Sequence, residues 1–234
     1  MVFNFIGEPI IQRWSEKAKK RILSSRVNST YILVNSISEV NPKIYLVQSS
    51  AIGIYDLINW HDESSKLYAN DFLGYVVKSW EGCLLQNTKF NNYCIVRLGL
   101  ILNQNGGYLQ SVSKSFKLKF GNYFGQRSNS FAFIDSSDFL RALEFILAKR
   151  MVGIANLVSP DITDNYSVAK ILRIIYKTWF LIPMPDFVLK LIFGEGFYML
   201  KGTPKVLPKR LLEEGFSFSF KSIEASLKHQ LQKN

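Results

Sequence analysis

Short apolar runs and longer amphipathic stretches alternate along this chain, and this alternation constrains its fold more than any other feature. Apolar runs of strand length cover residues 2–6, 43–48, 92–102 and 154–158. Between them, apolar side chains recur at helical spacing, as in Phe72, Val76, Trp80 and Leu84. Strands separated by helices of this length need crossover connections and therefore pair in parallel. The sequence predicts an α/β protein whose parallel sheet is flanked by helices.

Other segments have weaker patterns. Helices are predicted over about residues 12–39, 108–118 and 168–175, and another after Asp135, whose spacing to Asp138 is typical of a helix cap. Residues 121–133 are predicted as a loop, apart from the short run Phe131–Phe133. The tail from Pro183 to Asn234 is predicted to be all-helical.

Composition excludes several classes of protein. The longest apolar region, residues 168–200, is interrupted by charged residues and prolines, so no bilayer-spanning helix is predicted. The first residues contain no signal-peptide pattern. Two cysteines and two histidines provide neither a disulfide framework nor a metal site. We expect a protein of the cytoplasm or an organelle matrix, with no metal and no membrane partner.

A net charge of +11 raises the alternative of a basic surface that binds nucleic acid or anionic lipid. The basic residues are scattered, however, and no nucleic-acid-binding motif is present. We therefore interpret most lysines as solvated helix faces, and nucleic acid is not the expected partner.

Local strings of residues then occur in a recognisable order. They are NFIGEPI (4–10), SSR (24–26), SSAIGIYD (49–56), DFLGYVVKSWE (71–81), RLGLILNQNGG (97–107), FAFIDSSDFLRAL (131–143), NLVSPDITDNYSVAKIL (156–172) and KVLPKRLLEEGFSF (205–218). In this order the chain resembles atypical extended short-chain dehydrogenases/reductases of the NAD-dependent, nucleoside-diphosphate-sugar epimerase family. Some members of that group carry the label of cell-division inhibitor.

The resemblance implies a Rossmann-like NAD(P)-binding domain over residues 1–180 and a helical C-terminal domain over residues 181–234. It implies NADP as the cofactor and a small carbonyl or nucleotide-sugar-like substrate. The alternative is a non-enzymatic regulatory or interaction protein related to cell division, which would use the fold for binding alone.

Two departures from the family pattern bear on activity. The chain contains no glycine-rich turn of the kind that holds a pyrophosphate at a helix N-terminus, and Val2–Ile6 matches the fourth strand of the family fold. Leu73 and Val77 stand where the usual Tyr-x-x-x-Lys pair is expected, and Tyr75 and Lys78 are one residue too close to replace it. We expect a degenerate active site, weak or absent cofactor binding by this chain, and leave open whether it is an enzyme.

The resemblance also assigns individual site residues. Ser50 matches a serine that orients substrate oxygens, with a turn-forming hydroxyl as the alternative role. Asn4, Phe5, Ile6 and Gly7 match a turn beside the adenosine part of the cofactor. The remaining cofactor-binding positions are Arg26, Arg97 and Ile101. The alternative role of Arg26 is a solvated helix cation, and that of Ile101 is a buried strand residue.

Without three preceding strands, residues 2–6 would form an exposed sheet edge that has no lysine or proline to block pairing. Either the true start lies upstream, another polypeptide supplies the missing half, or the product is a remnant. We expect self-association, or association with such a missing half, through this edge.

Overall fold

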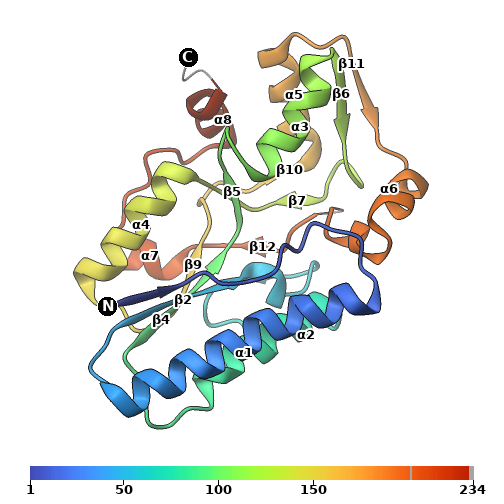
Figure 1. Cartoon of the computed structure of the whole chain (residues 1–234). Helices are drawn as coiled ribbons and strands as arrows, with labels where there is room; N and C mark the ends of the chain where they lie inside the picture. The colour runs from blue at the N-terminus through green and yellow to red at the C-terminus, as the bar shows by residue number, and fades with distance from the viewer. Residues whose placement is uncertain (201, 232–234) are drawn as a thin grey trace.

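The core of the molecule is a parallel sheet, as a computed structural model of the chain shows for residues 1–200 and 202–231 (Figure 1). Residues 201 and 232–234, which belong to the expected C-terminal domain, lie outside these described residues. The sheet has the strand order β1-β2-β4-β9. Its strands are β1 (Val2–Asn4), β2 (Leu46–Ala51), β4 (Tyr93–Leu98) and β9 (Gly153–Leu157). All pairs are parallel, so the predicted fold class is confirmed.

Both faces of the sheet are covered, which explains why most residues of β2, β4 and β9 are buried. One face packs against α1 (Glu16–Val40) and α2 (Phe72–Leu85), where Leu46 and Ile95 join the same buried cluster as Val34 and Leu84. The side chains that alternate with them point to the opposite face, because successive residues of a strand face opposite ways.

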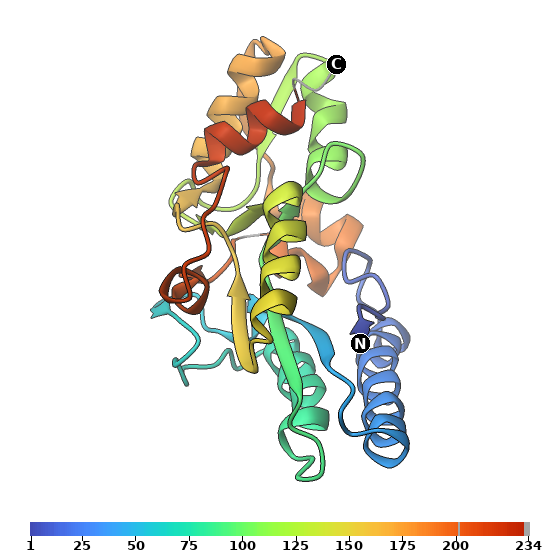
Figure 2. The same ribbon diagram turned by 90° about the vertical axis from the view of Figure 1, so that its left-hand side faces the viewer.

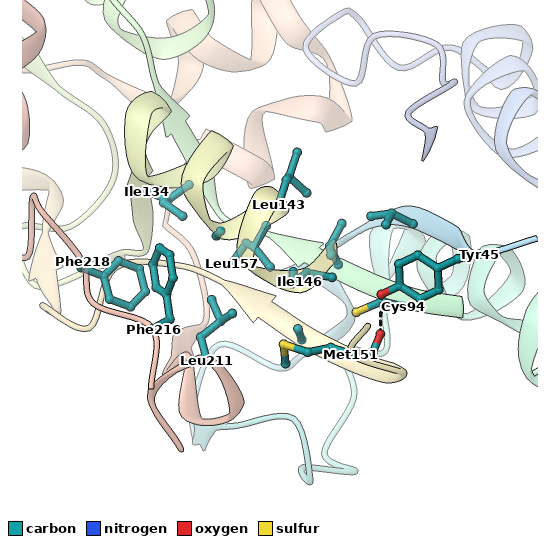
Figure 3. Packing of buried hydrophobic residues seen from close by; sticks show 14 residues of the cluster. Tyr45, Cys94, Ile134, Leu143, Ile146, Met151, Leu157, Leu211, Phe216 and Phe218 are labelled. Carbon is teal, nitrogen blue, oxygen red and sulfur yellow. Dashed lines mark hydrogen bonds between the residues drawn. The ribbon is translucent and has the colours of Figure 1, made fainter. Parts of the chain in front are cut away.

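That second face packs against α4 (Ser136–Lys149) and the C-terminal segment around α7 (Lys209–Glu213). Figure 3 shows Cys94 and Leu157 of the sheet beside Ile146 of α4, with Leu211 and Phe216 of the C-terminal segment completing the cluster. The C-terminal segment is thus part of the sheet's core, and the division at residues 180/181 stays a prediction.

A second group of elements stands at the opposite end of the molecule from α1 and α2 (Figures 1 and 2). It consists of α3 (Gly107–Lys117), β6 (Phe120–Tyr123), α5 (Asn165–Tyr176), β11 (Phe180–Pro183) and α8 (Ile223–Leu231). Buried side chains of these elements share one cluster with Leu102, Phe131 and Phe133.

Short strands connect the two groups. They are β3 (Trp60–His61), β5 (Leu100–Leu102), β7 (Ser130–Phe131), β8 (Phe133–Asp135), β10 (Thr163–Asp164) and β12 (Lys205–Val206). The parallel pairs are β5–β8 and β12–β3, and the antiparallel pair is β10–β7. The remaining elements are η1 (Ile52–Ile54), α6 (Asp186–Phe193) and η2 (Glu195–Leu200).

Three details differ from the sequence prediction. The predicted loop over residues 121–133 is wrong at its two ends, because β6 extends to Tyr123 and β7 begins at Ser130, whereas residues 124–129 form no helix or strand. The tail from Pro183 is not all-helical, because it begins with the last residue of β11, contains β12, and has no helix over residues 202–208 and 214–222. The predicted strand over residues 92–102 divides at Gly99, where a Cβ would lie only 2.8 Å from Val158 Cγ1 and 3.0 Å from the Ala132 carbonyl oxygen.

The described helices include none that combines the length and the apolar character needed to cross a bilayer.

Candidate functional site

The carboxyl end of β1 is held by a buried amide network. Asn4 is almost fully buried, and its Nδ2 donates to Gln48 Oε1 at 2.9 Å and to Thr30 Oγ1 at 3.1 Å. Its Oδ1 accepts the backbone N–H of Ile6, which closes the turn after the strand. Asn4 therefore fixes the turn from inside, while Phe5 and Ile6 are 43% and 60% exposed beside it.

Gly7 and Arg26 lie in direct contact beyond this turn. A Cβ on Gly7 would lie 2.8 Å from Arg26 Cζ and 2.9 Å from its Nη2, so the glycine lets the guanidinium approach the backbone closely. Arg26 Nη1 donates to the carbonyl oxygens of Glu8 at 3.0 Å and Ile22 at 3.1 Å. The predicted cofactor residues Gly7 and Arg26 are thus brought together.

The Arg26 side chain retains unused hydrogen-bonding capacity. The residue is only 8% exposed, yet its Nε has no hydrogen-bond partner in the part of the chain that the structure describes. Burial lowers the pKa of Arg26, against the favourable charge of Glu8. Unpaired buried donors are uncommon in native proteins, so this N–H is an unmet hydrogen bond beside the contact between Arg26 and Gly7.

Trp80 and Glu81 on α2 connect this region to a second polar cluster. The Trp80 ring lies under the Arg26 guanidinium, with 5.2 Å from Cζ to the ring centre, and its Nε1 donates to Thr30 Oγ1 at 2.9 Å. The next residue, Glu81, faces the strands instead and accepts from Ser50 Oγ at 2.5 Å. One turn of α2 therefore contacts both sets of predicted site residues.

Arg97 occupies the centre of the second cluster. Its Nε and Nη2 donate to the two carboxylate oxygens of Glu81 at 2.8 and 2.7 Å, and its Nη1 donates to Tyr55 Oη at 2.6 Å. Arg97 is 1% exposed and Glu81 is 2% exposed. Burial disfavours the guanidinium charge, but the hydrogen bonds and charge of Glu81 outweigh it and raise the pKa of Arg97. Burial likewise raises the pKa of Tyr55.

These contacts bear on the roles assigned to Ser50 and Arg97. Both side chains are buried and engaged with Glu81, an arrangement that holds β2, β4 and α2 in register. Their roles in catalysis and in cofactor binding stay predictions. Ile101 is partly buried on β5 beside the core of the sheet, which agrees with the simpler role of a strand residue.

No Tyr–Lys pair one turn apart is formed on α2. Leu73 is partly buried near Gly53, and Val77 is buried in an apolar cluster. Tyr75 is 58% exposed, and Lys78 Nζ lies over the Tyr68 ring instead. The side chains at this position therefore provide packing, with no phenol–ammonium pair for proton transfer.

Asp135 acts as the predicted helix cap. Its Oδ1 accepts the backbone N–H of Ser137, and its buried carboxylate also accepts from Ser226 Oγ and Gln230 Nε2 of α8. Asp138 is not a cap: its carboxylate accepts the backbone N–H groups of Ser219 and Phe220 instead. Both aspartates thus attach the C-terminal segment to α4.

Sequence reasoning missed the residues that complete these networks. Glu81, Thr30 and Gln48 were not singled out, although Glu81 ends the string DFLGYVVKSWE. A charged residue on the apolar stripe of a predicted helix was the signal available, because such a residue is almost never fully buried without a partner.

Known proteins resemble this chain over nearly its whole length. Epimerase family protein SDR39U1 of Mus musculus is 30% identical over 97% of this chain and 80% of its own length. The chloroplastic SDR39U1 homologue of Arabidopsis thaliana is 31% identical over 99% of this chain and 68% of its own length. Residues 184–230 match the family described as a domain of unknown function, DUF1731.

Solved structures agree with this relationship. The crystal structure of human epimerase family protein SDR39U1 (isoform 2) with NADPH superposes with a TM-score of 0.91, at 28% identity, over 99% of this chain and 81% of that one. A dTDP-4-dehydrorhamnose reductase of Bacillus anthracis in complex with NADP matches with a TM-score of 0.78 at 12% identity, over 99% of this chain and 80% of that one, which shows the shared fold alone.

Proposed function

This chain belongs to the epimerase family that includes the SDR39U1 proteins, and on that basis we propose that it binds NADP(H) at the carboxyl end of β1, with Arg26 as the contacting cation. The observation that carries the proposal is the close approach of the Arg26 guanidinium to Gly7 in the turn after β1. Dinucleotides bind α/β sheets outside the carboxyl ends of the strands, which is where this pair lies.

The residues present fit an anionic, partly aromatic ligand. Arg26 would meet an anionic oxygen of the cofactor, and the exposed side chains of Phe5 and Ile6 offer apolar surface for its adenosine part. Gly7 allows backbone and ligand to approach closely. The human relative that was crystallised with NADPH is consistent with this choice of cofactor.

Asn4 and Trp80 are positioning residues in this proposal. Asn4 holds the turn through Gln48 and Thr30, and Trp80 supports the guanidinium from below. Their contribution is to fix the site before the ligand arrives, which reduces the entropic cost of binding. Because the 234 residues contain no glycine-rich loop for the diphosphate, we expect weaker binding than for a protein with such a loop.

The proposed substrate is a small carbonyl compound or a nucleotide-sugar-like molecule, located between the carboxyl ends of the sheet strands and the C-terminal segment. Bound NADP(H) would supply the hydride in any redox step. With Leu73 and Val77 in place of a Tyr–Lys pair, this chain does not encode the usual proton transfer from α2. The regulatory role related to cell division stays a prediction.

A fluorescence titration of the purified chain with NADPH tests the cofactor proposal. We expect saturable binding, weakened about tenfold or more by Arg26→Gln, since a hydrogen bond to a charged group contributes about 1.5–3 kcal/mol. Gly7→Ala should weaken binding as well, because the new Cβ displaces the guanidinium.

Arg21→Gln is the matched control. Arg21 lies on the same helix, but its side chain is 49% exposed and paired with Glu8. Equal affinities for the Arg26 and Arg21 variants would contradict the proposed role of Arg26, and no saturable binding to the unmodified chain would overturn the proposed function.

A further inference from the structure

Two corners of the chain lie side by side at the end of the molecule opposite α1 and α2 (Figure 1). One corner, residues 117–120, joins α3 to β6, and the other, residues 177–180, joins α5 to β11. The strands that follow are parallel, with Phe120 paired with Phe180. The register therefore places both corners together, although sixty positions of sequence separate them.

The surface at these corners is apolar. Leu118 is 72% exposed and Phe120 is 60% exposed, while Trp179 and Phe180 are 69% and 58% exposed. Ile182, two residues beyond Phe180 on the same face of β11, is 52% exposed. We call these five residues the apolar tip. Single exposed apolar side chains are normal, but a contiguous group of this kind marks an interaction surface.

The strands that carry the apolar tip pack against a buried cluster beneath it. The inner face of β6 and β11 packs into the buried cluster through Tyr123 and Leu181. Gly121 makes this possible, because a Cβ there would lie 2.6 Å from Leu181 Cδ2 and 2.8 Å from the Phe180 carbonyl oxygen. The exposed side chains are thus presented by a packed ribbon and not by a loose loop.

The two stretches of sequence that form the apolar tip contain basic residues and no acidic ones. The sequence has no acidic residue between Glu81 and Asp135, and none between Asp164 and Asp186. These two stretches supply the whole of α3, β6, α5 and β11. Their basic residues close to the corners are Lys114, Lys117, Lys119 and Lys177.

Two of these lysines lie directly after a helix, and Lys119 Nζ donates to the Tyr176 carbonyl oxygen at 2.8 Å. Lys119 and Lys177 have φ of 67° and 52°, a region where glycine is the usual residue after a helix. A lysine at the C-terminal end of a helix complements the helix dipole. This role does not explain the exposed apolar side chains beside Lys119 and Lys177. Lys114 and Lys117 also line a hollow of about 260 Å³ together with Ser113 and Tyr176.

We infer that the apolar tip and the lysines around it dock the protein on an anionic lipid surface. Exposed aromatic and aliphatic side chains enter the region between headgroups and acyl chains, while lysines contact the anionic headgroups. Single-stranded nucleic acid fits less well, because Leu118 and Ile182 cannot stack on bases as aromatic rings do. The expectation of no membrane partner rested on the absence of a spanning segment, and surface docking requires none. The inference does not depend on the proposed cofactor site.

Sedimentation with lipid vesicles tests the inference. We expect the chain to bind vesicles of phosphatidylcholine mixed with phosphatidylserine, and to bind phosphatidylcholine vesicles much less. Because each lysine at such a surface contributes about fivefold in partitioning, Lys117→Gln combined with Lys177→Gln should lower binding about thirtyfold. Trp179→Ser combined with Phe180→Ser should also lower it severalfold.

Control variants of the same kind separate a local effect from a loss of folding. Ile58→Ser removes an apolar side chain that is 79% exposed away from the apolar tip, and Lys149→Gln removes a positive charge at the end of α4. Far-ultraviolet circular dichroism should show every variant folded. No binding to the anionic vesicles, or equal losses in the tip and control variants, would overturn the inference. So would binding of a single-stranded oligonucleotide through the same residues in the absence of vesicle binding.

Discussion

Replacing Glu81 with glutamine removes one negative charge from the buried cluster and almost no volume. The side chain accepts three hydrogen bonds, two from Arg97 and one from Ser50, at 2.5–2.8 Å. Arg97 cannot move its charge to solvent, because it is 1% exposed and its remaining nitrogen already donates to Tyr55. The variant therefore keeps a buried guanidinium without a counter-charge.

The expected cost follows from that geometry. Breaking a buried ion pair by removing one partner costs about 3–5 kcal/mol, a large part of the roughly 5–15 kcal/mol by which a domain is stable. Replacing both partners, as Glu81→Leu with Arg97→Met, removes both charges together. Ser50 then loses its acceptor, at about 1 kcal/mol, so the double variant should cost about 1–2 kcal/mol and be more stable than Glu81→Gln.

Urea unfolding followed by circular dichroism measures these differences. Glu224→Gln serves as the control, because the Glu224–Lys228 pair on α8 is more than half exposed and should contribute less than about 0.5 kcal/mol. Two results would refute the reasoning that Arg97 is left as an uncompensated buried charge. One is a loss below about 1 kcal/mol for Glu81→Gln, and the other is a double variant less stable than Glu81→Gln.

Three further predictions concern acid stability, thiol reactivity and association. Hydrogen bonding from the Asn59 backbone, assisted by its side chain, lowers the pKa of Asp56 to about 2. Because this folded-state pKa lies below the ordinary value, Asp56 stabilises the protein above pH 4 and loses that effect as the pH falls towards 2. Asp56→Asn should thus cost about 1 kcal/mol at pH 7, and this cost should shrink as the pH falls and vanish only below pH 2, as urea titrations would show. Burial raises the pKa of the Cys94 thiol to about 12, whereas Cys83 is only half-buried, so a colourimetric thiol reagent should modify Cys83 first and Cys94 only on unfolding. Two equal rates would contradict this prediction. We also propose self-association through the edge strand β1, where Phe3 is 40% exposed. Sedimentation velocity should show concentration-dependent association that Phe3→Lys abolishes, and identical profiles for both proteins would exclude it.

The main sheet and its long helices could be predicted from the sequence because their signals are local. The apolar runs at residues 43–48 and 154–158 overlap β2 and β9, and the stripe from Phe72 to Leu84 falls inside α2. Such patterns need no knowledge of which segments meet. The position of β1 at an edge of the sheet could also be predicted, because the family that the chain resembles fixes the order of the strands.

The strands β6 and β11 could not be predicted in this way. Each contains only four residues, and their pairing joins Phe120 to Phe180 across the intervening α4, β9 and α5. In β6 an exposed phenylalanine, Phe120, precedes a buried glycine, Gly121, so the residue types do not show which face is buried. The spacing of apolar residues alone therefore predicts irregular structure for such a segment.

The sequence named several residues of the candidate site but not the contacts between them. Gly7 and Arg26 were both assigned to the cofactor surface, and the structure brings them together. The acceptor for Ser50 and Arg97 could not be found from the sequence, because it depends on how α2 is rotated against β2 and β4. Trp80 contacts Arg26, whereas its neighbour Glu81 contacts Ser50 and Arg97. Only the packing of the helix on the sheet decides which side chain faces which cluster.

The mutual dependence of Glu81 and Arg97 has a consequence for divergence among relatives. Neither position can change alone without leaving an unpaired charge inside the protein. A relative that has lost one of the two charged residues should therefore have lost the other as well. Across an alignment of the family the two columns should therefore covary, either both ionic or both apolar, with Ser50 following its acceptor.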